Sequence, residues 1–262
     1  MGQGSAGSTP CLYRSMICFI LQGSKSVAIN ETLLSYDSEH YLISALDLPL
    51  TGQIFNGEEG QPYVAISLVL DPAILADLAA AMPPAREREI KGTGMTINPM
   101  TASIRDTLFR FLSLLETPED IPVLGPLTER ELLYRLLQGP QGKLLRQIAQ
   151  PEGALSSIRR AVAWIRENYA IRLRVEALCE VSGMSRASLH RHFLSLTGLS
   201  PVQYQKQLRL QEARQLLLSG EYRASEVAFV VGYESASQFS REYLRQFGSP
   251  PARNVREIRQ AI

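Results

Sequence analysis

The chain has 262 residues, of which 45% are hydrophobic and 20% are charged. These proportions are ordinary for a globular protein and exclude a disordered or fibrous one. The length leaves room for one large domain or two ordinary ones. The longest apolar run, residues 16–21, is far shorter than the ~20 residues that a membrane-spanning helix needs. The three cysteines, an odd number, predict no disulfide framework, so we expect a cytoplasmic protein without a membrane partner.

The net charge of +1 conceals an acidic first part and a basic second part. Residues 1–152 carry 11 Lys and Arg against 17 Asp and Glu, whereas residues 153–262 carry 16 against 9. The basic excess is almost all arginine, whose guanidinium can donate two hydrogen bonds at once to a phosphate or a base. This asymmetry favours a nucleic-acid-binding end joined to a different domain, although two solvated surfaces of opposite charge would give the same balance.

Short apolar segments separated by turn residues fill the region from Met16 to Leu70. Six strands are predicted, at residues 16–21, 27–30, 32–36, 41–44, 48–55 and 63–70. Their number and spacing are typical of an antiparallel β-sandwich or barrel. The first of them is apolar on both faces, which indicates a strand covered on both sides. Residues 1–10 are expected to form a flexible start.

After Leu70 the hydrophobic period becomes that of helices. Asp71 is predicted to cap a helix that has Pro72 in its first turn and ends at Pro83. A second helix carries one apolar stripe, formed by Ile104, Leu108, Phe111, Leu112 and Leu115, and shorter helices are predicted at residues 127–137 and 143–149. We expect residues 11–150 to form one domain, with a boundary near residues 150–153. The apolar faces of residues 104–115 and 132–137 are candidates for a dimer interface.

The basic part of the chain contains an internal repeat. Residues 178–184 align with residues 227–233 at an offset of 49, and residues 188–193 align with residues 238–243 at an offset of 50. Each copy predicts a short helix, a turn through Gly183 or Gly232, and a second helix that begins at a serine. Glycine suits such a turn because the chain leaves the first helix in a left-handed conformation. The pattern predicts two helix-turn-helix units, at about residues 175–197 and 224–247.

The second helix of each unit divides into a core face and a face left for DNA. Leu189, Phe193, Phe239 and Tyr243 lie four residues apart and are expected in the core. The candidates for base contact are Arg186, His190, Arg191, Ser237, Gln238, Ser240 and Arg241. Arg191 and Arg241 are the strongest of these, because an arginine can bind O6 and N7 of a guanine together. Arg186, Lys206 and Arg209 are also candidates for phosphate contacts; the alternative role for each arginine is an ion pair on the helix surface.

Both halves of the chain resemble the AraC/XylS family of bacterial transcriptional regulators. In the basic half the resemblance runs from about residue 157 to residue 258, and its most specific motifs are VGYES at 231–235, FSR at 239–241 and FGSPP at 247–251. In the first half it is carried by CLY at 11–13, FILQGSK at 19–25, YLI at 41–43, DLP at 47–49 and TGQ at 51–53.

The resemblance implies an α+β protein with two domains. The first would be a cupin-like antiparallel β-barrel with trailing helices, used for effector sensing, dimerisation or both. The second, residues 155–262, would be an all-α domain of seven helices whose two helix-turn-helix units are joined by a long helix, Pro201–Ser219. Its recognition helices would enter successive major grooves about 10 base pairs apart. The implied partners are double-stranded DNA, RNA polymerase, a small-molecule effector and a second copy of the chain, in a nucleoid-associated setting.

Other functions are weighed against this one. Cupin-like barrels can hold a catalytic metal, but only one of the three histidines, His40, lies in the predicted barrel. A cupin metal site needs several imidazole ligands, so we expect no metal, no cofactor and no enzyme activity. Cys11 and Cys18 are candidates for a thiol sensor, although Cys18 fits an inert buried thiol better. The sequence leaves open a constitutive DNA binder whose barrel only dimerises and, more remotely, a cupin-like enzyme or an interaction protein. It does not identify the effector, the operator or the sign of action.

Overall fold

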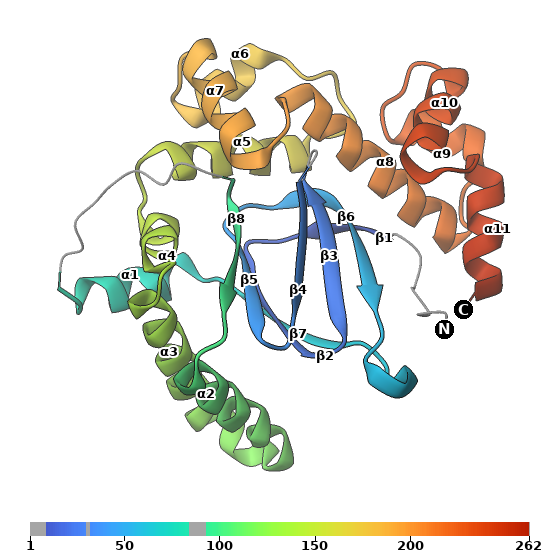
Figure 1. The fold of residues 1–262 in the computed structure, drawn as a ribbon. Helices are drawn as coiled ribbons and strands as arrows, with labels where there is room; N and C mark the ends of the chain where they lie inside the picture. The colour runs from blue at the N-terminus through green and yellow to red at the C-terminus, as the bar shows by residue number, and fades with distance from the viewer. Residues whose placement is uncertain (1–8, 30–31, 84–92, 262) are drawn as a thin grey trace.

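The structure is a computed structural model and describes residues 9–29, 32–83 and 93–261. Two antiparallel four-stranded sheets stand beside a group of helices (Figure 1). The first sheet has the order β1 (Thr9–Tyr13), β6 (Leu48–Phe55), β3 (Ser24–Ile29) and β4 (Thr32–Asp37). The second has the order β7 (Val64–Val69), β2 (Met16–Gln22), β5 (His40–Ser44) and β8 (Met95–Pro99).

Strand β2 is the centre of the N-terminal core. It pairs with β5 from Met16 opposite Ser44, and with β7 on its other edge. Successive side chains of a strand point to opposite faces, and Ile17, Cys18, Phe19 and Ile20 are all buried. The prediction that this strand is covered on both faces is therefore confirmed.

The expected closed barrel is wrong. A barrel requires hydrogen bonding all the way around, but the described strands pair into two separate sheets. The outer strands are β1 and β4 in one sheet and β7 and β8 in the other, and two of these four were not predicted. Strand β1 begins within the segment expected to be a flexible start, because Thr9 and Pro10 pair with β6. Strand β8 is short and ends at a proline, so its sequence gives only a weak strand signal.

Four helices and three short 3-10 turns complete the first part. The elements are η1 (Glu58–Gly60), α1 (Pro72–Ala80), α2 (Ala102–Ser113), η2 (Leu114–Glu116), η3 (Pro118–Asp120), α3 (Ile121–Gln138) and α4 (Gly142–Ala149). Asp71 caps α1 as predicted, accepting a hydrogen bond of 2.8 Å from the amide of Ala73. The predicted stripe on α2 fails at its end, because Leu115 belongs to η2 and is 70% exposed.

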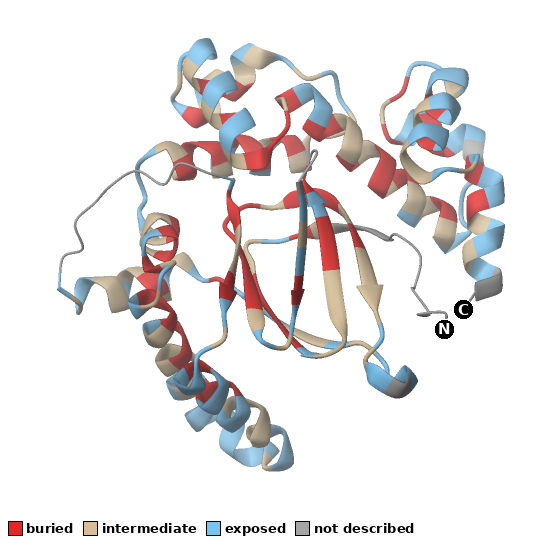
Figure 2. Ribbon diagram, in the orientation of Figure 1, coloured by how far each residue is buried: buried red, intermediate tan, exposed pale blue. Residues whose placement is uncertain are grey.

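Seven helices follow in the described part of the second half, in agreement with the expected number. They are α5 (Ala154–Glu167), α6 (Val175–Ser182), α7 (Arg186–Thr197), α8 (Pro201–Ser219), α9 (Ala224–Val230), α10 (Ala236–Phe247) and α11 (Pro251–Ala261). The buried residues run from the sheets into α5 and the first half of α8 as one cluster (Figure 2). A separate cluster joins the second half of α8 to α9 and α10. The first helix-turn-helix unit therefore shares its core with the sheets, whereas the second has a core of its own.

Candidate nucleic-acid interface

The first helix-turn-helix unit consists of α6 and α7. Helix α6 ends at Gly183, whose φ of +68° places it in the left-handed region that glycine adopts without strain. Two residues later Ser185 caps α7 by accepting a hydrogen bond from the amide of Ser188. Arg160 of α5 stabilises the turn by donating hydrogen bonds to the carbonyl oxygens of Val181 and Ser182.

The second unit repeats this geometry with α9 and α10. Gly232 has a φ of +90°, and Ser235 caps α10 by accepting from the amide of Gln238. Glycine is required at position 232 for a further reason. A Cβ atom there would lie 1.9 Å from the carbonyl oxygen of Ala170, so the turn packs directly on the loop between α5 and α6.

The core faces of both recognition helices are as predicted. Leu189, Phe193, Phe239 and Tyr243 are all at most 1% exposed. Phe193 meets Tyr204 of α8 edge-on, with ring centroids 5.6 Å apart, and Phe239 meets Tyr243 in the same way at 5.5 Å. These contacts fix which face of α7 and of α10 points outward.

All seven residues proposed for base contact are exposed. They are Arg186, His190, Arg191, Ser237, Gln238, Ser240 and Arg241. The hydrogen bonds made by their side chains are local ones: Arg191 lies 3.3 Å from a ring nitrogen of the adjacent His192, and Arg241 donates to the carbonyl oxygen of Ser237 one turn earlier. Exposure on the outer face of two capped helices keeps these side chains available for DNA, and their base contacts stay a prediction.

The two phosphate candidates on α8 are placed differently from the recognition residues. Lys206 forms an ion pair of 3.3 Å with Glu242 of α10. Arg209 is turned inward: its guanidinium donates to the carbonyl oxygens of Tyr169, Ala170, Ile171 and Gly232. Burial lowers the pKa of Arg209. Because its donors are engaged by backbone oxygens, we no longer assign Arg209 to a phosphate contact.

Asp47 joins the sheets to α5 and α8, the helices that flank the first unit. Its carboxylate accepts a hydrogen bond from the amide of Ser15 and forms an ion pair with Arg166 of α5. Its carbonyl oxygen accepts a hydrogen bond of 2.6 Å from the hydroxyl of Tyr204. Residues 47–49 are part of the resemblance to the family, but a local motif does not indicate partners that lie more than 100 residues further along the chain.

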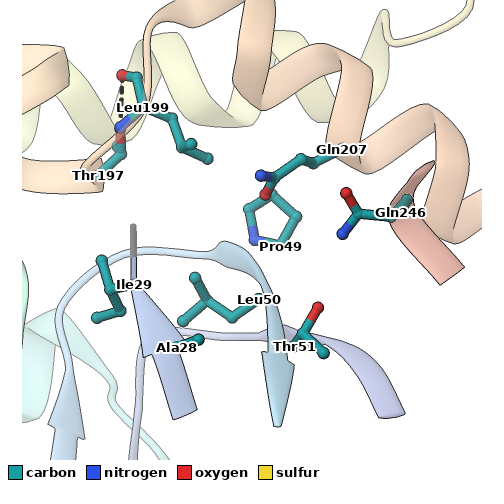
Figure 3. A pocket seen from close by; sticks show the side chains of 9 residues that line it. All are labelled: Ala28, Ile29, Pro49, Leu50, Thr51, Thr197, Leu199, Gln207 and Gln246. Atoms are coloured by element: carbon teal, nitrogen blue, oxygen red, sulfur yellow. Dashed lines mark hydrogen bonds between the residues drawn. The ribbon is translucent and has the colours of Figure 1, made fainter. Parts of the chain in front are cut away.

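A pocket of about 180 Å³ opens where the sheets, α8 and both units meet (Figure 3). It is lined by Ala28, Ile29, Pro49, Leu50, Thr51, Thr197, Leu199, Gln207 and Gln246. Gln207 and Gln246 enter it from α8 and α10, opposite the strand residues Leu50 and Thr51. A molecule in this pocket would touch the first sheet and parts of both helix-turn-helix units.

The cysteine and metal hypotheses rest on other residues. Cys18 is a free thiol, 4% exposed, and its neighbour Tyr36 has its pKa raised, first by burial and then by Cys18. The backbone of Cys11 lies in β1, but its side chain lies outside the described residues.

Within the described ranges, no three His, Cys, Asp or Glu side chains gather as metal ligands would. Over the same ranges, no helix has the length and apolarity needed to cross a membrane.

The chain has a β-sheet domain followed by two helix-turn-helix units, which are joined by one long helix. This arrangement is typical of DNA-binding regulators that have a separate N-terminal domain. Residues 2–144 match the family described as AraC-type transcriptional regulator N-terminus, and residues 178–257 match a helix-turn-helix domain family. The chain belongs to the AraC-type transcriptional regulators, a family of transcription factors and not of enzymes.

Individual relatives agree with this assignment. The HTH-type transcriptional activator RhaS of Salmonella schwarzengrund (strain CVM19633) is 31% identical over 163 residues, which make up 61% of this chain and 57% of the relative. RhaS of Salmonella typhimurium (strain LT2) is 30% identical over the same length. The match thus spans little more than half of these curated relatives.

Solved structures share the fold over almost the whole chain. Apo ToxT from Vibrio cholerae strain SCE256 superposes with a TM-score of 0.62 over 97% of this chain and 93% of its own, at 13% identity. ToxT from Vibrio cholerae O395 bound to (E)-4-(8-methylnaphthalen-1-yl)but-3-enoic acid gives a TM-score of 0.59 over 97% and 94%, at 12% identity. These structures support two antiparallel sheets with helices, followed by a helical domain.

Proposed function

We propose that the protein is a transcription regulator that binds one face of double-stranded DNA through two helix-turn-helix units. The observation that carries the proposal is the repeat itself: α7 and α10 have equivalent caps, equivalent buried faces and equivalent exposed arginines at positions 191 and 241. Each unit would read one short block of base pairs in a major groove, with the blocks about one helical turn apart. RNA polymerase is the partner through which a bound regulator would act on transcription.

Selection from random-sequence duplexes with the whole chain tests this proposal. We expect enrichment of two short blocks about 10 base pairs apart, with an affinity that falls steeply as the salt concentration rises because phosphate contacts release counterions. Failure to enrich any sequence over random DNA would contradict it.

The proposed effector site is the pocket of Figure 3. ToxT from Vibrio cholerae has been solved with an unsaturated fatty acid and with a synthetic butenoic acid, both carboxylic acids. The lining residues of the pocket are apolar, hydroxyl or amide side chains, and none of those described is charged. We therefore expect a small neutral effector, held by apolar contacts and by the amides of Gln207 and Gln246, in contrast to those acids.

A thermal-shift comparison of neutral and carboxylate compounds tests the pocket. A neutral ligand at 100 times its Kd would stabilise the fold by about 2.7 kcal/mol. The substitution Ala28→Trp fills the pocket from an exposed position and should abolish the shift, whereas Val69→Trp, at an exposed position on β7 of the second sheet, should leave it intact. A shift that survives Ala28→Trp would place the effector elsewhere. If no ligand exists, the chain would be a constitutive DNA binder.

Dimerisation is also proposed, but through a surface different from the expected one. Four leucines at the C-terminal end of α3, Leu132, Leu133, Leu136 and Leu137, are buried in the core and cannot meet a second copy. The large exposed apolar side chains of α3 are Ile121, Val123, Leu124, Leu127 and Tyr134. Val123, Leu127 and Tyr134 share one helical face because successive members are four and seven residues apart, and Leu124 borders this face three residues before Leu127. This face, together with Phe109 of α2, is the interface we propose.

Sedimentation equilibrium tests the interface. Leu127→Glu should convert a dimer into a monomer, because a carboxylate would be buried in an apolar contact. Leu33→Glu, at an equally exposed apolar position on β4, is the control and should remain dimeric. A dimer that is unaffected by Leu127→Glu would contradict the assignment.

A further inference from the structure

Helix α8 carries two cores, one for each DNA-binding unit. Its first half contributes Tyr204 and Leu208 to the core that contains α7, and its second half contributes Leu210, Ala213 and Leu217 to the core that contains α9 and α10. A shared helix alone permits each unit to roll about that helix. A contact between the two cores is therefore needed to fix the orientation of one unit relative to the other.

Arg209 lies at the junction of these two cores. Its Nε donates to the carbonyl oxygen of Tyr169 at 2.6 Å, and one terminal nitrogen donates to Ile171 at 2.9 Å, both in the loop that precedes the first unit. The other terminal nitrogen donates at 2.8 Å to the carbonyl oxygen of Gly232, in the turn of the second unit. One guanidinium thus joins the turn of the second unit to the loop that leads into the first unit, a geometry that a planar fork of donors allows and a single ammonium does not.

The surrounding contacts hold the same junction. The missing Cβ of Gly232 lets the second turn rest on Ala170, and the ring of Tyr169 packs against both cores. On the other side of Arg209, the Tyr233 hydroxyl donates to Glu242 at 2.9 Å, and Glu242 pairs with Lys206 of α8. We call Arg209, Gly232, the loop at residues 169–171 and the supporting ion pair between Lys206 and Glu242 the Arg209 bracket.

We propose that the Arg209 bracket sets the distance in base pairs that the protein requires between its two DNA blocks. The inference rests on the proposed binding of successive grooves. Each additional base pair moves the second block by about 3.4 Å along the DNA axis and turns it by about 35° around the axis. A bracketed pair of units cannot follow that movement, whereas a pair joined by α8 alone can.

The experiment uses the whole chain and duplexes that carry the two selected blocks with spacers changed by one or two base pairs. For the unaltered chain we expect one extra base pair to weaken binding about tenfold, a difference of about 1.4 kcal/mol. Arg209→Lys keeps the charge but cannot bridge both units, and the penalty should fall to about threefold or less. Affinity for a single block should not change.

Gln205→Ala is the matched control. Gln205 lies one turn before Arg209 and donates hydrogen bonds to the same loop, at Tyr169 and Ile171; within the described residues its side-chain amide is not seen to donate to the second unit. This variant should keep the tenfold spacing penalty. Glu242→Gln, which weakens the link to Lys206 and leaves Arg209 in place, should reduce the penalty by a smaller factor.

The outcomes separate the inference from the proposed function. A full spacing penalty in Arg209→Lys would overturn the inference, and so would an equal loss at every spacing with a shallower salt dependence, which is the signature of a phosphate contact. If Arg209→Lys does not fold, an unchanged penalty in Glu242→Gln would overturn it. If the unaltered chain selects no two-block sequence, the proposed function fails before the bracket is tested.

Discussion

Arg191 and Arg241 occupy equivalent positions of the repeat, and both are exposed on recognition helices. Replacing either by alanine should cost about 1–3 kcal/mol of binding and relax the preference at one base pair, because a bidentate contact to guanine would be lost. Binding to the selected duplex and to single-base variants of it, measured by fluorescence anisotropy, gives both quantities. Arg105→Ala removes an exposed arginine of α2 and serves as the control for charge. A uniform loss across all sequences would instead assign the arginine to phosphate.

The local sequence predicts the burial and the partners of some residues better than those of others. Phe193 and Phe239 were predicted to be buried because helical spacing decides which face a side chain occupies. Arg209 was misjudged because its partners are carbonyl oxygens of a loop about 40 residues earlier and of a turn 23 residues later. Only the folded chain brings those oxygens together, so no local pattern distinguishes an inward arginine from a phosphate-binding one.

At the scale of elements, Tyr204 of α8 contacts the residue that comes directly before β6. Its hydroxyl donates to the carbonyl oxygen of Asp47, and its ring packs on Phe193. Tyr204→Phe keeps the ring and removes one hydrogen bond, so we expect a loss of about 1 kcal/mol and a fall in Tm of about 2–4 °C. Tyr222→Phe, at a tyrosine that is 40% exposed in the segment between α8 and α9, is the control. Equal melting temperatures for Tyr204→Phe and the unaltered chain would show that this bond does not join the two halves.

The packing of α2 on α3 is predicted to depend on pH. Arg110 of α2, and then Arg135, lower the pKa of Glu131 on α3 to about 2, from an ordinary value of 4.5. A lowered pKa means that the stabilisation is complete above about pH 4.5 and is lost as the pH falls toward 2. Since the groups are partly exposed, the contribution is at most about 1 kcal/mol.

Urea unfolding of the chain and of Glu131→Gln between pH 7 and pH 3 measures this contribution. The difference in free energy of unfolding should be constant down to about pH 5 and shrink below it. A difference that does not vary with pH would mean that the carboxylate charge of Glu131 is not what stabilises the helix pair.

Elements with strong end signals were predicted with accurate bounds. The long helix Pro201–Ser219, which the family resemblance implied, has the expected bounds and strong end signals: Ser200 and Gln203 form a capping box at its start, and Gly220 ends it with a φ of +82°. Strands β1 and β8 were missed because each gives a weak local signal: β1 begins in the segment expected to be a flexible start, and β8 is short and ends at a proline. The barrel was implied by the family resemblance, while strand number and spacing fitted a sandwich as well as a barrel; closure depends on which edges pair, and that is not visible in any one strand.

At the scale of the whole molecule, the chain divides at a place that its composition does not mark. The charge shift near residue 152 separates the sheets from the helices, whereas the buried cores separate the second helix-turn-helix unit from everything before it. The first unit is joined to the segment before β8 by the hydrogen bond from the amide of Gly94 to the carbonyl oxygen of Leu196, and Asp47 joins the sheets to the flanking helices α5 and α8. A signal from the sheets would therefore reach the first unit through these contacts and the second through α8, the Arg209 bracket and Gln246 of α10, which lines the pocket of Figure 3.

Dimethyl sulfate protection of the selected duplex tests most directly whether both units read DNA, because the reagent reports guanine N7 in the major groove. Bound protein should protect two clusters of guanines on one face of the duplex, centred about 10 base pairs apart. Arg191→Ala should weaken one cluster and Arg241→Ala the other. Protection of a single cluster, or of two clusters on opposite faces, would contradict the reading of successive major grooves by two units on one helix.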